Sequence, residues 1–209
     1  VVSIDSNNLG TFTLTLYRDN NPGTASLPTS VQLATVVPVT LNLIQLDTVN
    51  SAYPVERYIY QGTAQVNSYG KYFASYSLCC RNAAIQNVSG TPNFFIATEY
   101  TNSLSTPNST PVFLNEPVVT FPLDTLWSYN PLPFDADGDS LHWIIDTPAV
   151  AFGQYVAGYS TPPGNSNGPL SMNSQTGEIT WSPSQVGNYA ISILVEEYRN
   201  GIQIGEIRR

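Results

Sequence analysis

Three aspartates, Asp135, Asp137 and Asp139, occupy alternating positions of one short segment, with Gly138 between the last two. Carboxylates this close repel one another unless a cation lies among them. Oxygen ligands at alternating positions of a tight loop suit calcium, and the glycine permits the turn. An EF-hand is excluded, because no helical pattern flanks the loop and no glutamate follows at its twelfth position. Two interpretations remain open: a calcium site, or a solvated acidic turn without a metal.

Cys79 and Cys80 are adjacent, and they are the 2 cysteines of the chain. They form neither a disulfide framework nor a zinc-binding pattern. Neighbouring residues of a strand point to opposite faces. One interpretation is therefore a buried thiol, packed as a small hydrophobe, beside a partly exposed one. The other is a vicinal disulfide between the two residues.

Catalytic motifs are not recognisable in the sequence. His142 is the 1 histidine of the chain, which excludes a histidine-rich transition-metal site. No Gly-x-Ser-x-Gly elbow supports serine catalysis. We therefore predict that the protein is not an enzyme.

A long segment from Ala149 to Asn167 is rich in glycine, proline, serine and asparagine. Rigid β-scaffolds present function on such loops. Tyr155 and Tyr159 lie in this segment, and exposed tyrosines stack on sugars or anchor adhesive contacts. The segment is thus a candidate recognition loop. It suggests an alternative function, a carbohydrate-binding module that uses aromatic-rich loops.

The elements that must position these residues read as strands. Thr11–Tyr17 alternates apolar and β-branched residues with a period of two. Asn200-Gly201 lies between two alternating runs and is a strong hairpin signal. Proline and glycine, 16 and 14 in number, recur too often for long helices. Short strands with regular turn signals predict an all-β chain built from sandwiches.

The segment from Leu104 to Pro111 is small, polar and proline-bearing, as linkers are. Each part on either side of it has the size of one immunoglobulin-like domain. We predict two tandem immunoglobulin-like β-sandwiches, residues 1–107 and residues 108–209. The chain begins without methionine and stops inside a predicted strand. We therefore expect a processed protein or a fragment of a longer one.

Composition excludes several classes of partner. The formal net charge is −8, and phosphate backbones and anionic membranes repel such a surface. No apolar run approaches the roughly 20 residues of a bilayer-spanning helix. We predict no nucleic-acid partner and no membrane span. Clustered carboxylates can instead collect divalent cations.

The second half resembles the cadherin-like, dystroglycan-type bacterial immunoglobulin repeat. The resemblance covers nearly all of residues 108–209 and rests on Asn108–Phe113, Asp135–Leu141, Ser171–Pro183 and Gly187–Glu197. It implies a calcium ion near the junction with the preceding domain, bound by Asp135, Asp137, Asp139 and Asn108. Glu99 and Glu116 are candidate extra ligands through their proximity to the linker. Cadherins carry a denser acidic linker than this chain, so a single ion is expected.

The first half resembles a segment of very large surface proteins of Bacteroidetes-type bacteria, including gliding-motility adhesin-like proteins exported by the type IX system. The residues that carry the resemblance are Leu16–Asp19, Val55–Gly62, Cys79–Asn82 and Ile85–Asn87, with Glu197–Arg209 in the second half. It implies a secreted protein at the bacterial cell surface. We expect a structural and adhesive segment of a surface protein or filament, stiffened between domains by calcium. Its expected partners are neighbouring domains or subunits of the same protein, and a polysaccharide or cell-surface ligand.

Overall fold

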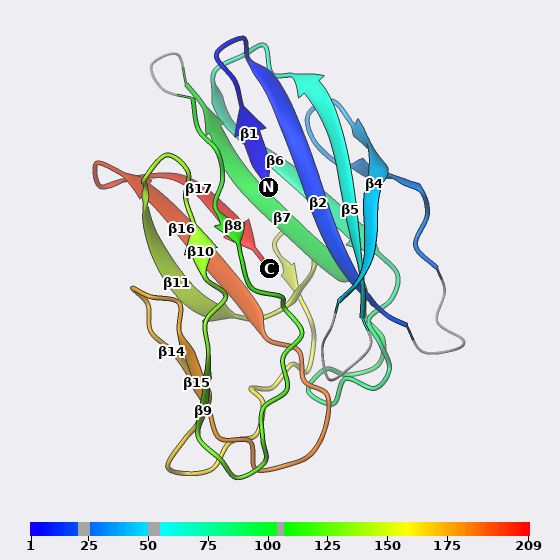
Figure 1. Cartoon of the computed structure of the whole chain (residues 1–209), viewed down its shortest axis with the longest axis vertical. Helices are drawn as coiled ribbons and strands as arrows, with labels where there is room; N and C mark the ends of the chain where they lie inside the picture. The colour runs from blue at the N-terminus through cyan, green and yellow to red at the C-terminus, as the bar shows by residue number, and fades with distance from the viewer. Residues whose placement is uncertain (21–25, 50–54, 104–106) are drawn as a thin grey trace.

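The computed structural model describes residues 1–20, 26–49, 55–103 and 107–209. Within these ranges the chain forms seventeen strands and no helix (Figure 1). It follows that the described part of the chain holds no helix long and apolar enough to cross a bilayer. The strands assemble into several antiparallel sheets, so the prediction of an all-β chain is confirmed.

One five-stranded sheet comes entirely from the first half of the chain. Its strands follow the order β1 (Val2–Ile4), β2 (Leu9–Asp19), β5 (Val55–Gln65), β4 (Val39–Val49) and β3 (Ser30–Leu33). Alternate residues of a strand point to opposite faces. This alternation buries Phe12, Leu14 and Leu16 of β2 and exposes the residues between them to a greater extent.

A second five-stranded sheet takes strands from both halves. Its order is β11 (Ser140–Asp146), β16 (Ser192–Arg199), β17 (Ile202–Arg208), β7 (Phe94–Asn102) and β6 (Gly70–Leu78). The two halves meet where β17 pairs with β7, with Glu206 opposite Glu99 and Ile207 opposite Thr98. Residues on both sides of the predicted boundary at 107/108 therefore share one hydrogen-bonded sheet.

Two apolar cores lie between the sheets. The larger core joins β2, β4 and β5 to β6 and β7 and includes Tyr60, Tyr76 and Tyr100. The smaller core, around Trp143 and Ile179, joins the second sheet to a three-stranded sheet of β14 (Ser171–Met172), β15 (Ile179–Trp181) and β9 (Trp127–Tyr129). Two short pairs complete the structure: β8 (Val112–Phe113) with β10 (Pro133–Phe134), and β12 (Ala149–Ala151) with β13 (Gln154–Tyr155).

The predicted linker is a packed segment over residues 107–111, whereas 104–106 lie outside the described residues. Thr110 donates its backbone N–H to the Val2 carbonyl and accepts the Val2 N–H on its hydroxyl, at 2.8 and 2.9 Å. The Asn108 carbonyl accepts the Ile4 N–H at 3.3 Å. The side chains of Asn108 and Thr110 are buried. Backbone pairing thus fixes this segment against β1.

The hairpin predicted at Asn200-Gly201 joins β16 and β17, and both residues have left-handed backbone conformations, with φ of 52° and 78°. These are the conformations that a two-residue hairpin turn requires. The pairing register then shifts between Glu197 and Tyr198, so that Glu197 lies opposite Gly205. Strand alternation places Glu197 on the same face as the buried Val195. A carboxylate is therefore directed toward the interior of the protein.

Candidate metal centre

The acidic segment forms a tight turn between β10 and β11. One carboxylate oxygen of Asp135, Oδ1, accepts the backbone N–H groups of Asp137 and Asp139, each at 3.0 Å. Gly138 has a φ of 81°, a left-handed conformation that glycine adopts without steric cost. The turn is thus built around the Asp135 side chain. Its second oxygen, Oδ2, is buried and has no hydrogen-bond partner among the described residues.

Glu197 reaches the same place from β16, and its side chain is fully buried, at 0% exposure. Its Oε1 accepts a hydrogen bond from the Asn108 amide at 2.9 Å. Its Oε2 is buried without a hydrogen-bond partner in the described structure. A Cβ atom on Gly205 would lie 2.7 Å from Oε2, so a glycine opposite Glu197 leaves the space that this carboxylate needs.

The carboxylates of Asp135, Asp139 and Glu197 form a compact group, which we call the acidic centre. They can offer one oxygen each, with all three atoms within 4.8 Å of one another. Buried acceptors without partners are unfavourable unless a donor or a cation satisfies them. Hard oxygen ligands of this kind bind calcium or magnesium rather than zinc or copper. The residues present therefore fit a hard divalent cation.

Burial and neighbouring charges disfavour the ionised form of two carboxyl groups in the acidic centre. Burial raises the pKa of the Asp135 carboxyl above its ordinary value. Burial is also the main reason why the pKa of Glu197 is raised, and the charges of Asp135 and Asp139 add to the effect. A divalent cation among these oxygens would favour the ionised carboxylates and reverse the direction of both changes.

An arginine occupies the other side of Asp139. Arg199 donates from Nε to Asp139 Oδ1 at 2.7 Å and from Nη2 to Asp139 Oδ2 at 2.5 Å. The same Nη2 donates to the Asn108 amide oxygen at 2.6 Å and lies 3.9 Å from the Asp137 carboxylate. Asp137 in turn accepts the Ser109 backbone N–H at 2.6 Å. Arg199 therefore connects the turn, the β16 strand and the linker.

The structure brings together part of the predicted ligand set. Asp135 and Asp139 belong to the acidic centre, whereas Asp137 and Asn108 lie beside it and contact Arg199. Glu197 joins the group although it was not among the predicted ligands. Strand alternation was the signal for it, because Glu197 follows Ile193 and Val195 in the period-two pattern of inward-facing residues.

The two candidate extra ligands have other partners. On the second sheet, Glu99 accepts a hydrogen bond from the Lys71 ammonium at 2.7 Å. Glu116 pairs with the Arg57 guanidinium at 2.9 Å. Neither belongs to the acidic centre. Each carboxylate is instead paired with a basic side chain, Glu99 with Lys71 and Glu116 with Arg57.

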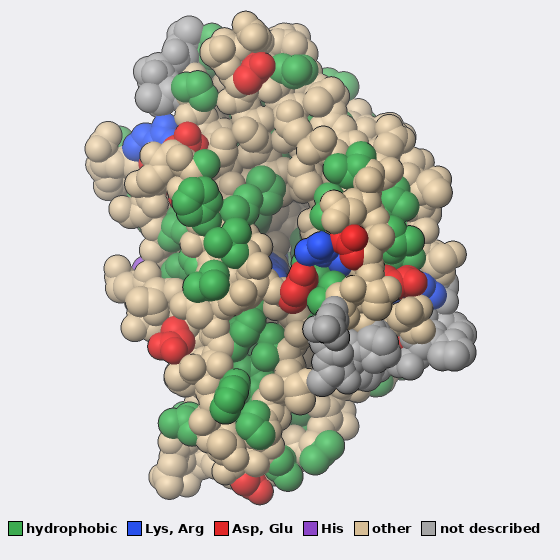
Figure 2. Space-filling view, in the orientation of Figure 1, with side chains coloured by type: hydrophobic (Ala, Val, Ile, Leu, Met, Phe, Trp, Pro, Cys, Tyr) green, Lys and Arg blue, Asp and Glu red, His purple; other side chains and the backbone are tan. Residues whose placement is uncertain are grey.

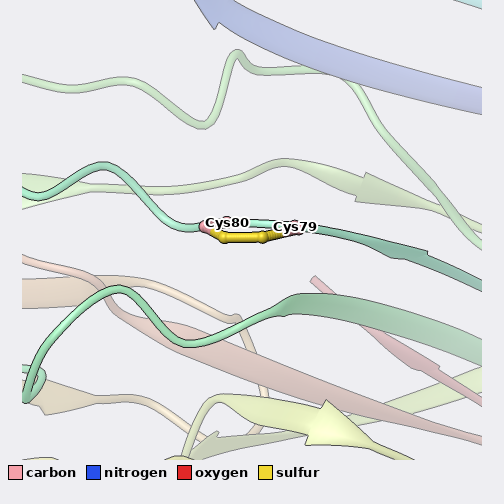
Figure 3. Close-up of a disulfide and its surroundings, with 2 residues drawn as sticks. All are labelled: Cys79 and Cys80. Carbon is pink, nitrogen blue, oxygen red and sulfur yellow. A yellow bond between two sulfur atoms is a disulfide. The ribbon is translucent and has the colours of Figure 1, made fainter.

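The remaining candidate residues lie apart from this centre. Cys79 and Cys80 are exposed and joined by a disulfide (Figure 3). Tyr155 is 51% exposed on β13, where the Arg208 guanidinium lies 5.5 Å from its ring centroid. Tyr159 is half-buried and its hydroxyl lies 3.4 Å from the Ala190 carbonyl. Of these two tyrosines Tyr155 is therefore the more exposed, with the Arg208 guanidinium near its ring.

Comparison of the chain with models of protein families, with curated proteins and with solved structures found no match.

Proposed function

We propose that this protein is a structural and adhesive segment of a large secreted bacterial cell-surface protein, in which calcium stiffens the connection between two β-sandwiches. The observation that carries the proposal is the acidic centre, where Asp135 and Glu197 each have a buried carboxylate oxygen without a partner. The three carboxylates of the centre can each offer one oxygen to the same cation. The role is mechanical rather than catalytic.

The surroundings of the acidic centre support a role at a joint. Glu197 and Arg199 bind the Asn108 side chain, and the Asn108 carbonyl accepts the Ile4 N–H of β1. A cation that fixes Glu197 thereby acts on the segment that connects the two halves. In this proposal the first half is immunoglobulin-like and the second is a cadherin-like repeat of the kind found in Bacteroidetes-type surface proteins.

Exposed apolar side chains support contacts with neighbouring domains or subunits of the same surface protein. Leu126 and Trp127 are 61% and 52% exposed. Figure 2 shows apolar side chains gathered over the end of the molecule where β9 lies. Contiguous apolar patches on a protein surface commonly mark sites of association.

The calcium role has a direct consequence for thermal stability. We expect the melting temperature to be higher in millimolar calcium than in excess chelator, because a ligand that binds only the folded state stabilises it. A calcium concentration 100-fold above Kd adds about 2.7 kcal/mol to the free energy of unfolding. For a chain of this size, that raises the melting temperature by about 5–10 °C. Thermal unfolding followed by circular dichroism measures the difference. Equal melting temperatures in the two solutions would remove the basis of the proposal.

A further inference from the structure

The oxygens around Asp139 divide into two sets, of which one surrounds the Arg199 guanidinium. The first set is the acidic centre itself, in which Asp135 Oδ2 and Glu197 Oε2 are buried without partners. The second set surrounds the Arg199 guanidinium and consists of both Asp139 oxygens, the Asn108 amide oxygen and, at 3.9 Å, an Asp137 oxygen. The Asp139 carboxylate belongs to both sets, so the two positions are adjacent.

The second set has the composition of a cation site. It contains two carboxylates and one amide oxygen, which are the ligand types that calcium takes from proteins. The side chain of Asp139 is 4% exposed, and those of Arg199 and Asp137 are 22% and 28% exposed. The guanidinium is planar, permanently charged and suited to a two-pronged contact with one carboxylate. It therefore supplies positive charge among these oxygens.

We propose that Arg199 occupies the position of a second cation, so that the cluster takes one calcium ion, and that removing its charge opens a second calcium position. This inference rests on the proposed calcium role of the acidic centre. It accounts for the position of Asp137 and Asn108 beside the acidic centre, because each places a side-chain oxygen near the guanidinium. It also links the charge of one residue on β16 to the number of ions at the joint.

Two roles of Arg199 would differ in the number of calcium ions that the Arg199→Gln variant binds. If Arg199 only orients Asp139 from outside the coordination shell, its loss weakens binding of the single ion by about 10- to 100-fold and creates no new position. If it stands in for a cation, its loss raises the number of ions bound. The stoichiometry of binding therefore separates the two roles.

The test is a calorimetric titration of calcium into the chelator-treated wild-type chain and into three variants. We expect one ion for the wild type and two for Arg199→Gln. Arg199→Lys keeps a positive charge at this position and should still bind one ion. Arg208→Gln is the matched control, because it removes another arginine–aspartate pair, with Asp146, from the neighbouring strand, and it should also bind one ion.

A single ion in Arg199→Gln, at any affinity, would overturn the assignment while leaving the calcium role intact. No binding to the wild-type chain would overturn the calcium role, and the assignment with it. Asp137→Asn tests the assignment independently should Arg199→Gln fail to fold. We expect it to bind one ion with a loss of no more than about 10- to 100-fold, as for a group outside the coordination shell, whereas complete loss of calcium binding would make Asp137 a ligand of the first position and contradict the assignment.

Discussion

Glu197→Gln should abolish the stabilisation by calcium while leaving the metal-free protein at least as stable as the wild type. Glutamine has the same shape and can still accept the Asn108 hydrogen bond that Glu197 accepts at 2.9 Å. Its amide hydrogens can donate to the neighbouring carboxylates, which replaces a buried like-charge contact by a hydrogen bond. It removes the anionic ligand, however. The calcium-dependent gain in the free energy of unfolding, about 2.7 kcal/mol at a calcium concentration 100-fold above Kd, should therefore disappear.

The control for this change lies one residue away. Glu196 faces the opposite side of β16 and contacts His142 Nδ1 at 3.0 Å and the Tyr198 hydroxyl at 3.1 Å. Glu196→Gln removes the same charge from the same strand, and calcium should still stabilise this variant as it does the wild type. Thermal and urea unfolding with calcium and with chelator measure both variants. Equal calcium stabilisation of Glu197→Gln and wild type would show that the ion binds elsewhere.

Asp139→Ala should destabilise the metal-free protein by about 3 kcal/mol, because it leaves a largely buried Arg199 without the carboxylate to which it donates two hydrogen bonds. The Asp139 side chain is 4% exposed and forms two hydrogen bonds to the guanidinium. The double variant Asp139→Ala/Arg199→Gln also removes the charge of the unpaired arginine. It should therefore recover part of the lost free energy of unfolding. Urea unfolding in excess chelator measures the change.

Asp47→Ala provides the comparison for the second prediction. It breaks a similar pair with Arg57, but the two side chains are 34% and 30% exposed and Arg57 keeps Glu116 as a partner. Exposed ion pairs contribute about 0–1 kcal/mol. If Asp139→Ala lowers the free energy of unfolding by no more than Asp47→Ala does, the contacts of Arg199 do not stabilise the connection between the two halves.

Local patterns predicted the strands well, because alternation and turn chemistry are short-range properties. The Thr11–Tyr17 run lies in β2, and Asn200-Gly201 makes the hairpin. The pairing of β17 with β7 joins residues more than a hundred positions apart, such as Ile207 and Thr98. No local pattern specifies such a partner, so the shared sheet could not be foreseen.

The candidate centre was foreseen in part for the same reason. Asp135 and Asp139 are close in sequence, and their spacing indicated a cation. Glu197 lies far away in sequence, on β16. Arg199, at the end of the same strand, donates a hydrogen bond to the Asn108 side chain and lies near the Asp137 carboxylate. The sequence shows a charge on an inward-facing strand position, but only the fold shows which loop it meets.

The most direct test of the calcium centre is a crystal structure of the chain grown in calcium, with the ion located by anomalous scattering. We predict one ion bound by carboxylate oxygens of Asp135, Asp139 and Glu197 at about 2.3–2.6 Å, with Arg199 still paired to Asp139. An ion bound at another site, or the same crystals without an ion among these three carboxylates, would contradict the account.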